Sequence, residues 1–232
     1  MRNLGNFIAA SGKEEWISLS CAMISASIEE ALEEKGSCFL AISGGNTPKV
    51  LFEALIEEAY LQDEDWKNVH FFWVDERMVP TDSSESNFGN AMKYLQKLPA
   101  NFHQMYDDEL GGEASLDNYR QKLQQVPHEG NIPVFDLVLL GMGEDGHTAS
   151  LFPGSKGLEV KDQSAFINQI PSLNTSRMTL SFPVLQQATE CFILLNGPNK
   201  VKIMQEILEK PTEYPIETAL EGLSPKTWIY YN

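Results

Sequence analysis

The sequence predicts an α/β fold with a mostly parallel, Rossmann-like doubly wound sheet and helices on both faces. Short unbroken apolar runs, typical of strands that are buried on both faces, alternate along the chain with longer segments of helical spacing. Strand and helix in alternation build right-handed crossovers and therefore a parallel sheet. No repeat, low-complexity tract or long flexible linker interrupts the pattern, so residues 1–232 are expected to form one domain.

The apolar runs give the expected strands, and the segments between them give the expected helices. The strands are expected at residues 38–43, 69–74, 135–140, 177–182, 191–196 and 227–231. The helices are expected at residues 17–32, 47–60, 86–95, 116–126 and 199–209. Thr47 is expected to cap the second helix, with Pro48 in its first position. Residues 98–112 and 153–176 are expected to be irregular insertions.

Composition limits the partners and the compartment. With 33 acidic and 17 basic residues the net charge is −16, which argues against nucleic acid, since phosphate backbones need clustered Lys and Arg. Any anion site must be a local basic cluster that works against the field of the whole chain. The 3 cysteines show no metal-type spacing and favour a reduced chain. Without a secretory signal or a run near the roughly 20 apolar residues that span a bilayer, a soluble cytoplasmic protein with no membrane contact is expected.

Polar and glycine-rich segments follow four of the expected strands, at the edge where such sheets bind ligands. The first is "SGGNTP", residues 43–48, between a buried strand and a helix start. Its glycines let the backbone approach a ligand, and free N–H groups at a helix start suit a phosphate. The alternative is a tight turn with a helix cap. The expected phosphate-binding residues of this loop are Ser43, Gly44, Gly45, Asn46 and Thr47.

The second segment is "DER", which directly follows the aromatic strand at residues 69–74. Asp75 and Glu76 are a carboxylate pair, but no third metal ligand is nearby in sequence, so no metal is expected. Arg77 offers a planar fork for a phosphate or a carboxylate. The alternative is an internal salt bridge in which Asp75 or Glu76 neutralises Arg77.

The third segment, "GMGEDGH", ends on His147. A histidine at a strand's carboxyl end is suited to act as a general base near neutral pH, and Asp145 lies two residues earlier to orient it. The alternative is a histidine that merely caps the loop. Because the chain has no GxSxG elbow and no cysteine beside His147, direct attack by an activated water is favoured over covalent chemistry.

Two further basic residues complete the candidate cluster. Arg177 opens the strand expected at residues 177–182, and Lys200 follows "NGPN" after the strand expected at residues 191–196. Each alone would be read as solvated, but together with Arg77 they supply the local positive charge that the acidic chain otherwise lacks. The residues thus indicate a small phosphate-bearing substrate and a histidine base.

Several of these strings together resemble the glucosamine-6-phosphate isomerase/6-phosphogluconolactonase family. They occur in order from about Cys38 to Lys200: "SGGNTP", "FFWVDERMVP…SNFGNA", "FDLVLLGMGEDGHTASLFPGS", "RMTLSFPVLQQA" and "GPNK". The resemblance implies the NagB/RpiA/CoA-transferase-like fold. It also implies hydrolysis of 6-phospho-D-glucono-1,5-lactone to 6-phospho-D-gluconate, the second step of the oxidative pentose phosphate pathway, without metal or cofactor.

The resemblance also implies roles for particular residues. His147 would take a proton from the water that attacks C1 and return it to the ring oxygen, with Asp145 orienting it. Arg77, Arg177 and Lys200 would hold the phosphate and stabilise the oxyanion with the loop of residues 43–47, in a division that the sequence leaves open. The catalytic set is thus His147, Asp145 and Arg177, and the substrate-binding set adds Asp75 and Gly143 to the glycine loop, Arg77 and Lys200. Asn46 stands where the family often has Ser.

Two rival functions remain to be weighed. A glucosamine-6-phosphate deaminase/isomerase shares the glycine loop, but it usually reads "DGHIAFNEP"-like where this chain has "DGHTASLFP", and it has a tyrosine-type residue at the place of Arg77. A non-catalytic sugar-phosphate-binding regulator should have lost the base, whereas His147 and Asp145 are both present. The expected partner is a small sugar phosphate lactone, and the expected assembly is a monomer or a weak homo-oligomer.

Overall fold

A computed structural model describes residues 3–57 and 60–232 of the chain, and the side chains of residues 46–49 are also outside the description. The side-chain roles expected of Asn46 and Thr47 therefore fall outside the described residues. The helix α2, Asn46–Glu57, is described as a backbone element. It begins one residue before the expected cap Thr47.

Most strands of the described residues form a seven-stranded parallel sheet. Its order is β1-β12-β11-β8-β2-β3-β5, and every neighbouring pair runs parallel. The strands are β1 Asn6–Ala9, β2 Cys38–Ile42, β3 Val69–Trp73, β5 Asn101–Phe102, β8 Leu137–Leu140, β11 Glu190–Asn196 and β12 Lys226–Tyr231. The predicted mostly parallel sheet is confirmed. The edge strand β1 was not predicted, because its apolar run from Phe7 to Ala9 is short.

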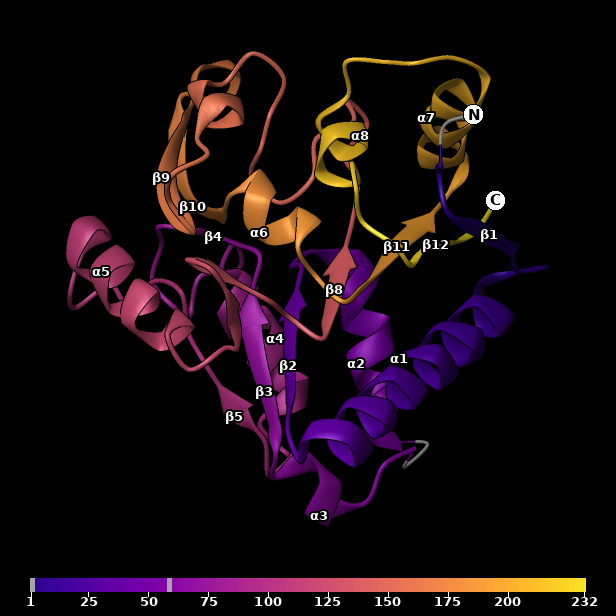
Figure 1. Ribbon diagram of the computed structural model, residues 1–232, viewed down its shortest axis with the longest axis horizontal. Coiled ribbons are helices and arrows are strands. Elements are labelled where there is room, and N and C mark those ends of the chain that lie inside the picture. Colours follow the sequence, from indigo (N-terminus) through magenta and orange to yellow (C-terminus); the bar gives the residue numbers. More distant parts are fainter. Residues whose placement is uncertain (1–2, 58–59) are drawn as a thin grey trace.

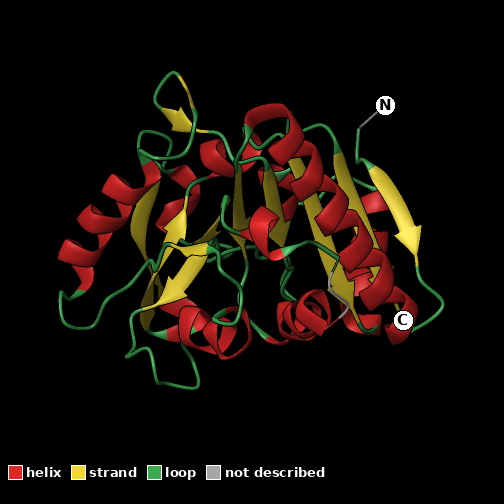
Figure 2. Cartoon of the chain, turned by 90° about the horizontal axis from the view of Figure 1, so that it is seen from below, coloured by secondary structure: helices red, strands yellow, loops and turns green. Residues whose placement is uncertain are grey.

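Helices cover both sides of this sheet, as Figure 2 shows. They are α1 Lys13–Lys35, α2, α3 Asp63–Trp66, α4 Asn87–Leu95, α5 Gly112–Leu123, α6 Phe182–Gln186, α7 Pro198–Glu209 and α8 Pro215–Ala219, with 3₁₀ turns at Lys156–Glu159 and Pro171–Leu173. The helix α1 ends at Gly36, whose φ of 75° is left-handed and whose N–H donates to the Leu32 carbonyl. Ser86 caps α4 by accepting from the Gly89 N–H.

A second, antiparallel sheet departs from the prediction. It consists of β4 Asp75–Arg77, β10 Thr175–Leu180 and β9 Ala165–Ile170, in the order β4-β10-β9. The "DER" segment is thus a short strand. The run expected at 177–182 belongs to this sheet only as far as Leu180, since Phe182 begins α6. The prediction of an irregular segment at 153–176 was wrong, since β9 lies within it. Polar residues at 168 and 169 interrupt the apolar run of β9 and hide it from the sequence pattern. A small hairpin, β6 His128–Glu129 and β7 Ile132–Pro133, completes the strands described.

The chain order of the strands creates a crevice between β2 and β8. From β2 the chain proceeds through β3 to β5 on one side, and from β8 through β11 to β12 on the other. Ligands of doubly wound sheets bind outside the carboxyl ends of the strands at such a reversal. In Figure 1 these ends point upward, with the second sheet and α8 above them. The Ser43 hydroxyl spans the crevice: it donates to the Leu139 carbonyl (2.9 Å) and accepts from the Gly141 N–H (3.2 Å).

Candidate active site

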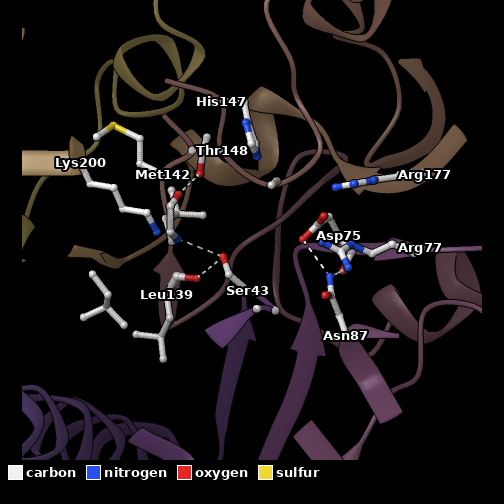
Figure 3. A pocket seen from close by; sticks show the side chains of 17 residues that line it. Ser43, Asp75, Arg77, Asn87, Leu139, Met142, His147, Thr148, Arg177 and Lys200 are labelled. Carbon is white, nitrogen blue, oxygen red and sulfur yellow. Dashed lines mark hydrogen bonds between the residues drawn. The ribbon is translucent and has the colours of Figure 1, made fainter. Parts of the chain in front are cut away.

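A pocket of about 180 Å³ opens at this crevice. The predicted residues that line it are Ser43, Gly44, Gly45, Asp75, Arg77, Gly143, His147, Arg177 and Lys200. Figure 3 shows Lys200 on one side, the two arginines on the other and His147 above and between them in this view. Asp145 is not among these lining residues, but its carboxylate contacts the His147 imidazole. Four strand ends that lie far apart in the sequence thus meet around one cavity.

His147 and Asp145 form a hydrogen-bonded pair. The His147 Nδ1 lies 2.5 Å from the Asp145 Oδ1, which also accepts the His147 backbone N–H at 3.2 Å. Burial by itself would raise the pKa of Asp145, but its hydrogen bonds and charge interaction with His147 outweigh that effect and hold the pKa below its ordinary value. An ionised Asp145 keeps the imidazole proton on Nδ1. In the described part of the chain Nε2 has no hydrogen-bond partner and is free to accept a proton.

Glycine at position 143 gives the imidazole its room. A Cβ built on Gly143 would lie 2.2 Å from both Cε1 and Nδ1 of His147 and 2.8 Å from the Asp145 Oδ1. The Gly143 N–H donates to the His147 carbonyl at 2.8 Å, which closes the loop on itself. Gly146, with φ +74°, lies against the Tyr214 ring, so that a Cβ there would meet it at 2.4 Å. The glycines of "GEDGH" therefore shape the loop around the base.

The residues after His147 form a tight turn tied to the rest of the site. The Thr148 hydroxyl donates to the Gly141 carbonyl at 2.8 Å, and Ala149 has a left-handed φ of 48°. Ser150 is fully buried, and its hydroxyl donates to the Asp75 Oδ2 at 2.6 Å. Sequence reasoning assigned these three residues no role. The signal was present in the string "HTASLFP", which was used only to establish a resemblance.

Arg77 and Arg177 face each other directly across the antiparallel pair of β4 and β10. The Nε of each is buried without a hydrogen-bond partner, and Arg77 donates through Nη1 to the Glu85 carbonyl at 2.7 Å. Burial, and then the charge of Arg77, lower the pKa of Arg177. Like charges placed opposite each other destabilise a sheet. Two guanidinium groups that keep an unused Nε–H donor beside a pocket therefore suit a bound anion, which would offset that repulsion.

The carboxylates beside Arg77 are engaged elsewhere. Asp75 accepts from the Asn87 Nδ2 at 3.3 Å and from Ser150. Glu76 accepts the backbone N–H groups of Arg77, Asn87 and Phe88, each at 2.7 Å, and so caps α4. Burial raises the pKa of Glu76 to about 7. Within residues 3–57 and 60–232 neither carboxylate forms an ion pair with Arg77, so the alternative of an internal salt bridge is not observed. Nor do three potential metal-ligating side chains gather anywhere in these ranges.

The glycine loop and Lys200 form the other side of the pocket. Gly44 lies against Asn87, since a Cβ on Gly44 would come 2.0 Å from the amide of that side chain. Gly45 has φ +96°, and α2 begins at the next residue. Lys200 lies in the first turn of α7; burial lowers its pKa, and the nearby Glu144 opposes this. Both the N–H and the hydroxyl of Ser43 donate to the Leu139 carbonyl, so the N–H groups that this loop could offer an anion are those after Ser43.

Other residues that line the pocket escaped sequence reasoning. They are Asn87, Leu139, Leu140, Gly141, Met142, Thr148, Ala149 and Leu194. Asn87 is the most informative of them, because its Nδ2 donates to the Asp75 carbonyl at 2.9 Å and thereby connects α4 to β4. Its signal was the string "SNFGNA", which the sequence pattern presented only as a helix start.

The fold and pocket together define an α/β enzyme that acts on a small anionic substrate. The model of the family described as "Glucosamine-6-phosphate isomerases/6-phosphogluconolactonase" matches residues 11–228. The chain belongs to this family. It is 30% identical over 232 residues to a 6-phosphogluconolactonase of Chlamydia muridarum, with 99% of this chain and 89% of the relative covered.

Solved structures give the same family resemblance. The 6-phosphogluconolactonase of Thermotoga maritima has a TM-score of 0.81 at 31% identity, over 98% of this chain and 100% of the other. That of Trypanosoma cruzi has a TM-score of 0.86 at 30% identity, over 100% and 96%. In the described part of this chain no helix has the length and apolar character that crossing a membrane requires.

Proposed function

We propose that the chain hydrolyses 6-phospho-D-glucono-1,5-lactone to 6-phospho-D-gluconate by direct attack of a water molecule. The observation that carries the proposal is the His147–Asp145 pair, which holds the imidazole with Nε2 free at a pocket that also contains two arginines whose Nε atoms lack hydrogen-bond partners among the described residues. The names of the relatives support the choice of substrate. A lactone with a phosphate provides the two features that this pocket suits, a carbonyl and an anion.

The chemistry follows from the tautomer of the base. Nε2 of His147 takes a proton from the attacking water as its oxygen bonds to C1, and the carbonyl becomes an oxyanion. Asp145 stabilises the imidazolium that forms. When the oxyanion collapses, the bond from C1 to the ring oxygen breaks, and the imidazolium returns the proton to that oxygen. No covalent intermediate is required, since the Ser43 hydroxyl is committed to Leu139 and the three cysteines are buried without a place in the pocket lining.

The two sides of the pocket suit different parts of the substrate. The start of α2, the glycine loop and Lys200 together offer backbone N–H groups and an ammonium, the combination that binds phosphate. Arg177 shares a neighbour with the base: its Cζ is 5.4 Å from the centroid of the Phe152 ring, on which the His147 imidazole stacks. We therefore assign the phosphate to the glycine loop and Lys200, and the C1 oxyanion to Arg177 with Arg77.

The test is lactone disappearance, with the lactone made in situ and a blank without enzyme, because lactones open spontaneously in water. Wild type should accelerate the reaction, and His147→Ala should lower kcat by about 10² to 10⁴, as for a lost general base. His128→Ala is the matched control, since His128 is exposed and outside the pocket lining. Near-full activity in a folded His147→Ala protein would overturn the mechanism. A wild-type protein that does not open the lactone but releases ammonia from glucosamine 6-phosphate would overturn the proposed substrate.

A further inference from the structure

Phe152 contacts two candidate catalytic groups with one aromatic ring. The His147 imidazole stacks on this ring with centroids 3.9 Å apart and planes inclined by 21°. The Arg177 Cζ lies 5.4 Å from the same ring centroid. Phe152 is only 4% exposed, and it is absent from the described residues that line the pocket. The ring therefore acts on a substrate only through the two side chains that it contacts.

The turn after His147 holds this ring in place. The Leu151 N–H donates to the Thr148 carbonyl at 3.0 Å, and the left-handed φ of 48° at Ala149 reverses the chain. The reversal returns Phe152, five residues after the base, to a position against the imidazole. The Ser155 N–H donates to the Phe152 carbonyl at 3.0 Å, which fixes the backbone on the far side. The ring thus belongs to the same rigid loop as the base.

The face of an aromatic ring carries partial negative charge and attracts cations. Arg177 is a cation throughout the proposed reaction, whereas His147 becomes one only when it takes the proton from water. The attraction between Phe152 and the imidazolium therefore develops as the transition state forms. An interaction that is stronger in the transition state than in the ground state raises kcat.

We propose that Phe152 is a positioning residue for the lactonase reaction. Its ring holds the His147 imidazole and the Arg177 guanidinium in their working places and stabilises the imidazolium through its face. This inference rests on the proposed function and assigns a further residue to it. It accounts for an aromatic residue at this place, because an aliphatic side chain could not offer a ring face to the imidazole and the guanidinium.

Two variants separate the ring's electrostatics from its packing. Phe152→Leu should lower kcat about 10-fold to 100-fold with a smaller change in KM, since a misplacement of the catalytic groups by about 1 Å can cost about 10²-fold in rate. It should also shift the acidic limb of the pH–rate profile to lower pH, because the protonated base has lost a favourable contact. Replacement of Phe152 by 3,4,5-trifluorophenylalanine keeps the ring but weakens its quadrupole, and it should lower kcat several-fold with an unchanged melting temperature.

Phe182→Leu is the matched control, because Phe182 is also an almost fully buried phenylalanine, 5% exposed, and contributes nothing to the pocket lining. Its kcat should equal that of wild type. Wild type without lactonase activity would refute the proposed function. Active wild type with a Phe152→Leu kcat no lower than that of the control, or with an unaffected fluorinated variant, would overturn the role of Phe152 alone.

Discussion

A base can work at residue 147 because its chain neighbours leave it room and orientation. Gly143 has no side chain to collide with the imidazole, and the Asp145 carboxylate, two residues before the base, contacts its Nδ1. Ser150 ties the following turn to Asp75. A general base must be held within hydrogen-bond reach of its water. The loop meets this requirement with short side chains and backbone hydrogen bonds.

The charges on the two sides of the pocket give the first prediction. Arg177→Ala should lower kcat by about 10² to 10³, as expected when a donor to an oxyanion is removed, with a smaller change in KM. Lys200→Ala should chiefly raise KM, because a phosphate is held equally in the ground and transition states. Steady-state kinetics of the two variants checks this, with exposed Lys97→Ala as the control. If Arg177→Ala chiefly raised KM and Lys200→Ala chiefly lowered kcat, the phosphate would instead lie on the Arg177 side and the oxyanion on the Lys200 side.

Sequence reasoning found the residues that carry reactive groups and missed those that hold them. His147, Arg77 and Lys200 were accessible because reactive side chains at strand ends are few and chemically distinctive. Phe152 and Asn87 were not, since their contacts are with segments distant in the chain or arise from the path of a turn. An apolar or amide side chain in a pattern reads as core or as helix surface until the folded chain shows what it touches.

At the scale of elements, the small sheet extends directly from the main sheet. Val74 lies between β3 and β4; its N–H donates to the Ile42 carbonyl of β2 at 2.9 Å, and its carbonyl accepts from the Leu180 N–H of β10 at 2.8 Å. The arginine pair is thereby fixed above the crevice by backbone hydrogen bonds. The long parallel strands were predictable because they are unbroken apolar runs. The three residues of β4 and the polar-interrupted β9 were not, since only pairing across the chain defines them.

Asn168 of β9 is the element-scale link between this sheet and the histidine loop. Its Nδ2 donates to the Ser150 carbonyl at 2.8 Å and to the Ser155 hydroxyl at 3.0 Å, and it is 2% exposed. Asn168→Ala should leave a buried carbonyl without its donor and lower the free energy of unfolding by about 1 to 3 kcal/mol.

Urea denaturation measures this loss as a lower midpoint at an unchanged slope. The neighbouring Gln169→Ala is the control, because Gln169 is exposed on the same strand and its replacement should change stability by about 0.5 kcal/mol or less. Equal midpoints for the two variants would contradict the role of Asn168 as a link.

At the scale of the whole molecule, buried titratable groups change the stability of the fold in opposite directions over one pH range. Burial raises the folded-state pKa of Glu76 from its ordinary 4.5 to about 7, so the folded protein binds more protons than the unfolded chain in that interval. Glu76 therefore makes stability fall as pH rises from about 4.5 to 7. A histidine pair at the far end of β3 acts in the opposite direction, and the pH profile of wild type is the sum of both.

That pair is His70 and His103, whose ring nitrogens lie 3.0 Å apart between stacked aromatic rings. Burial, then the charges of His70 and Lys122, lower the pKa of His103 from 6.5 to about 4. The unfolded chain binds the extra proton between these values, so His103 makes stability rise as pH rises from about 4 to 6.5. His70, whose pKa burial also lowers, contributes in the same direction.

A difference measurement isolates His103 from the opposing Glu76. Urea unfolding of wild type and His103→Gln at several pH values gives the difference in their free energies of unfolding, from which the contribution of Glu76 cancels. Gln keeps a polar group near the Nε2 position but does not titrate. The difference should move in favour of wild type by about 1 to 2 kcal/mol between pH 4 and 6.5, less than the full linkage value because the pair is partly solvated. A difference independent of pH would show that His103 titrates alike in both states, and the acid sensitivity of the fold would then have to come from other groups.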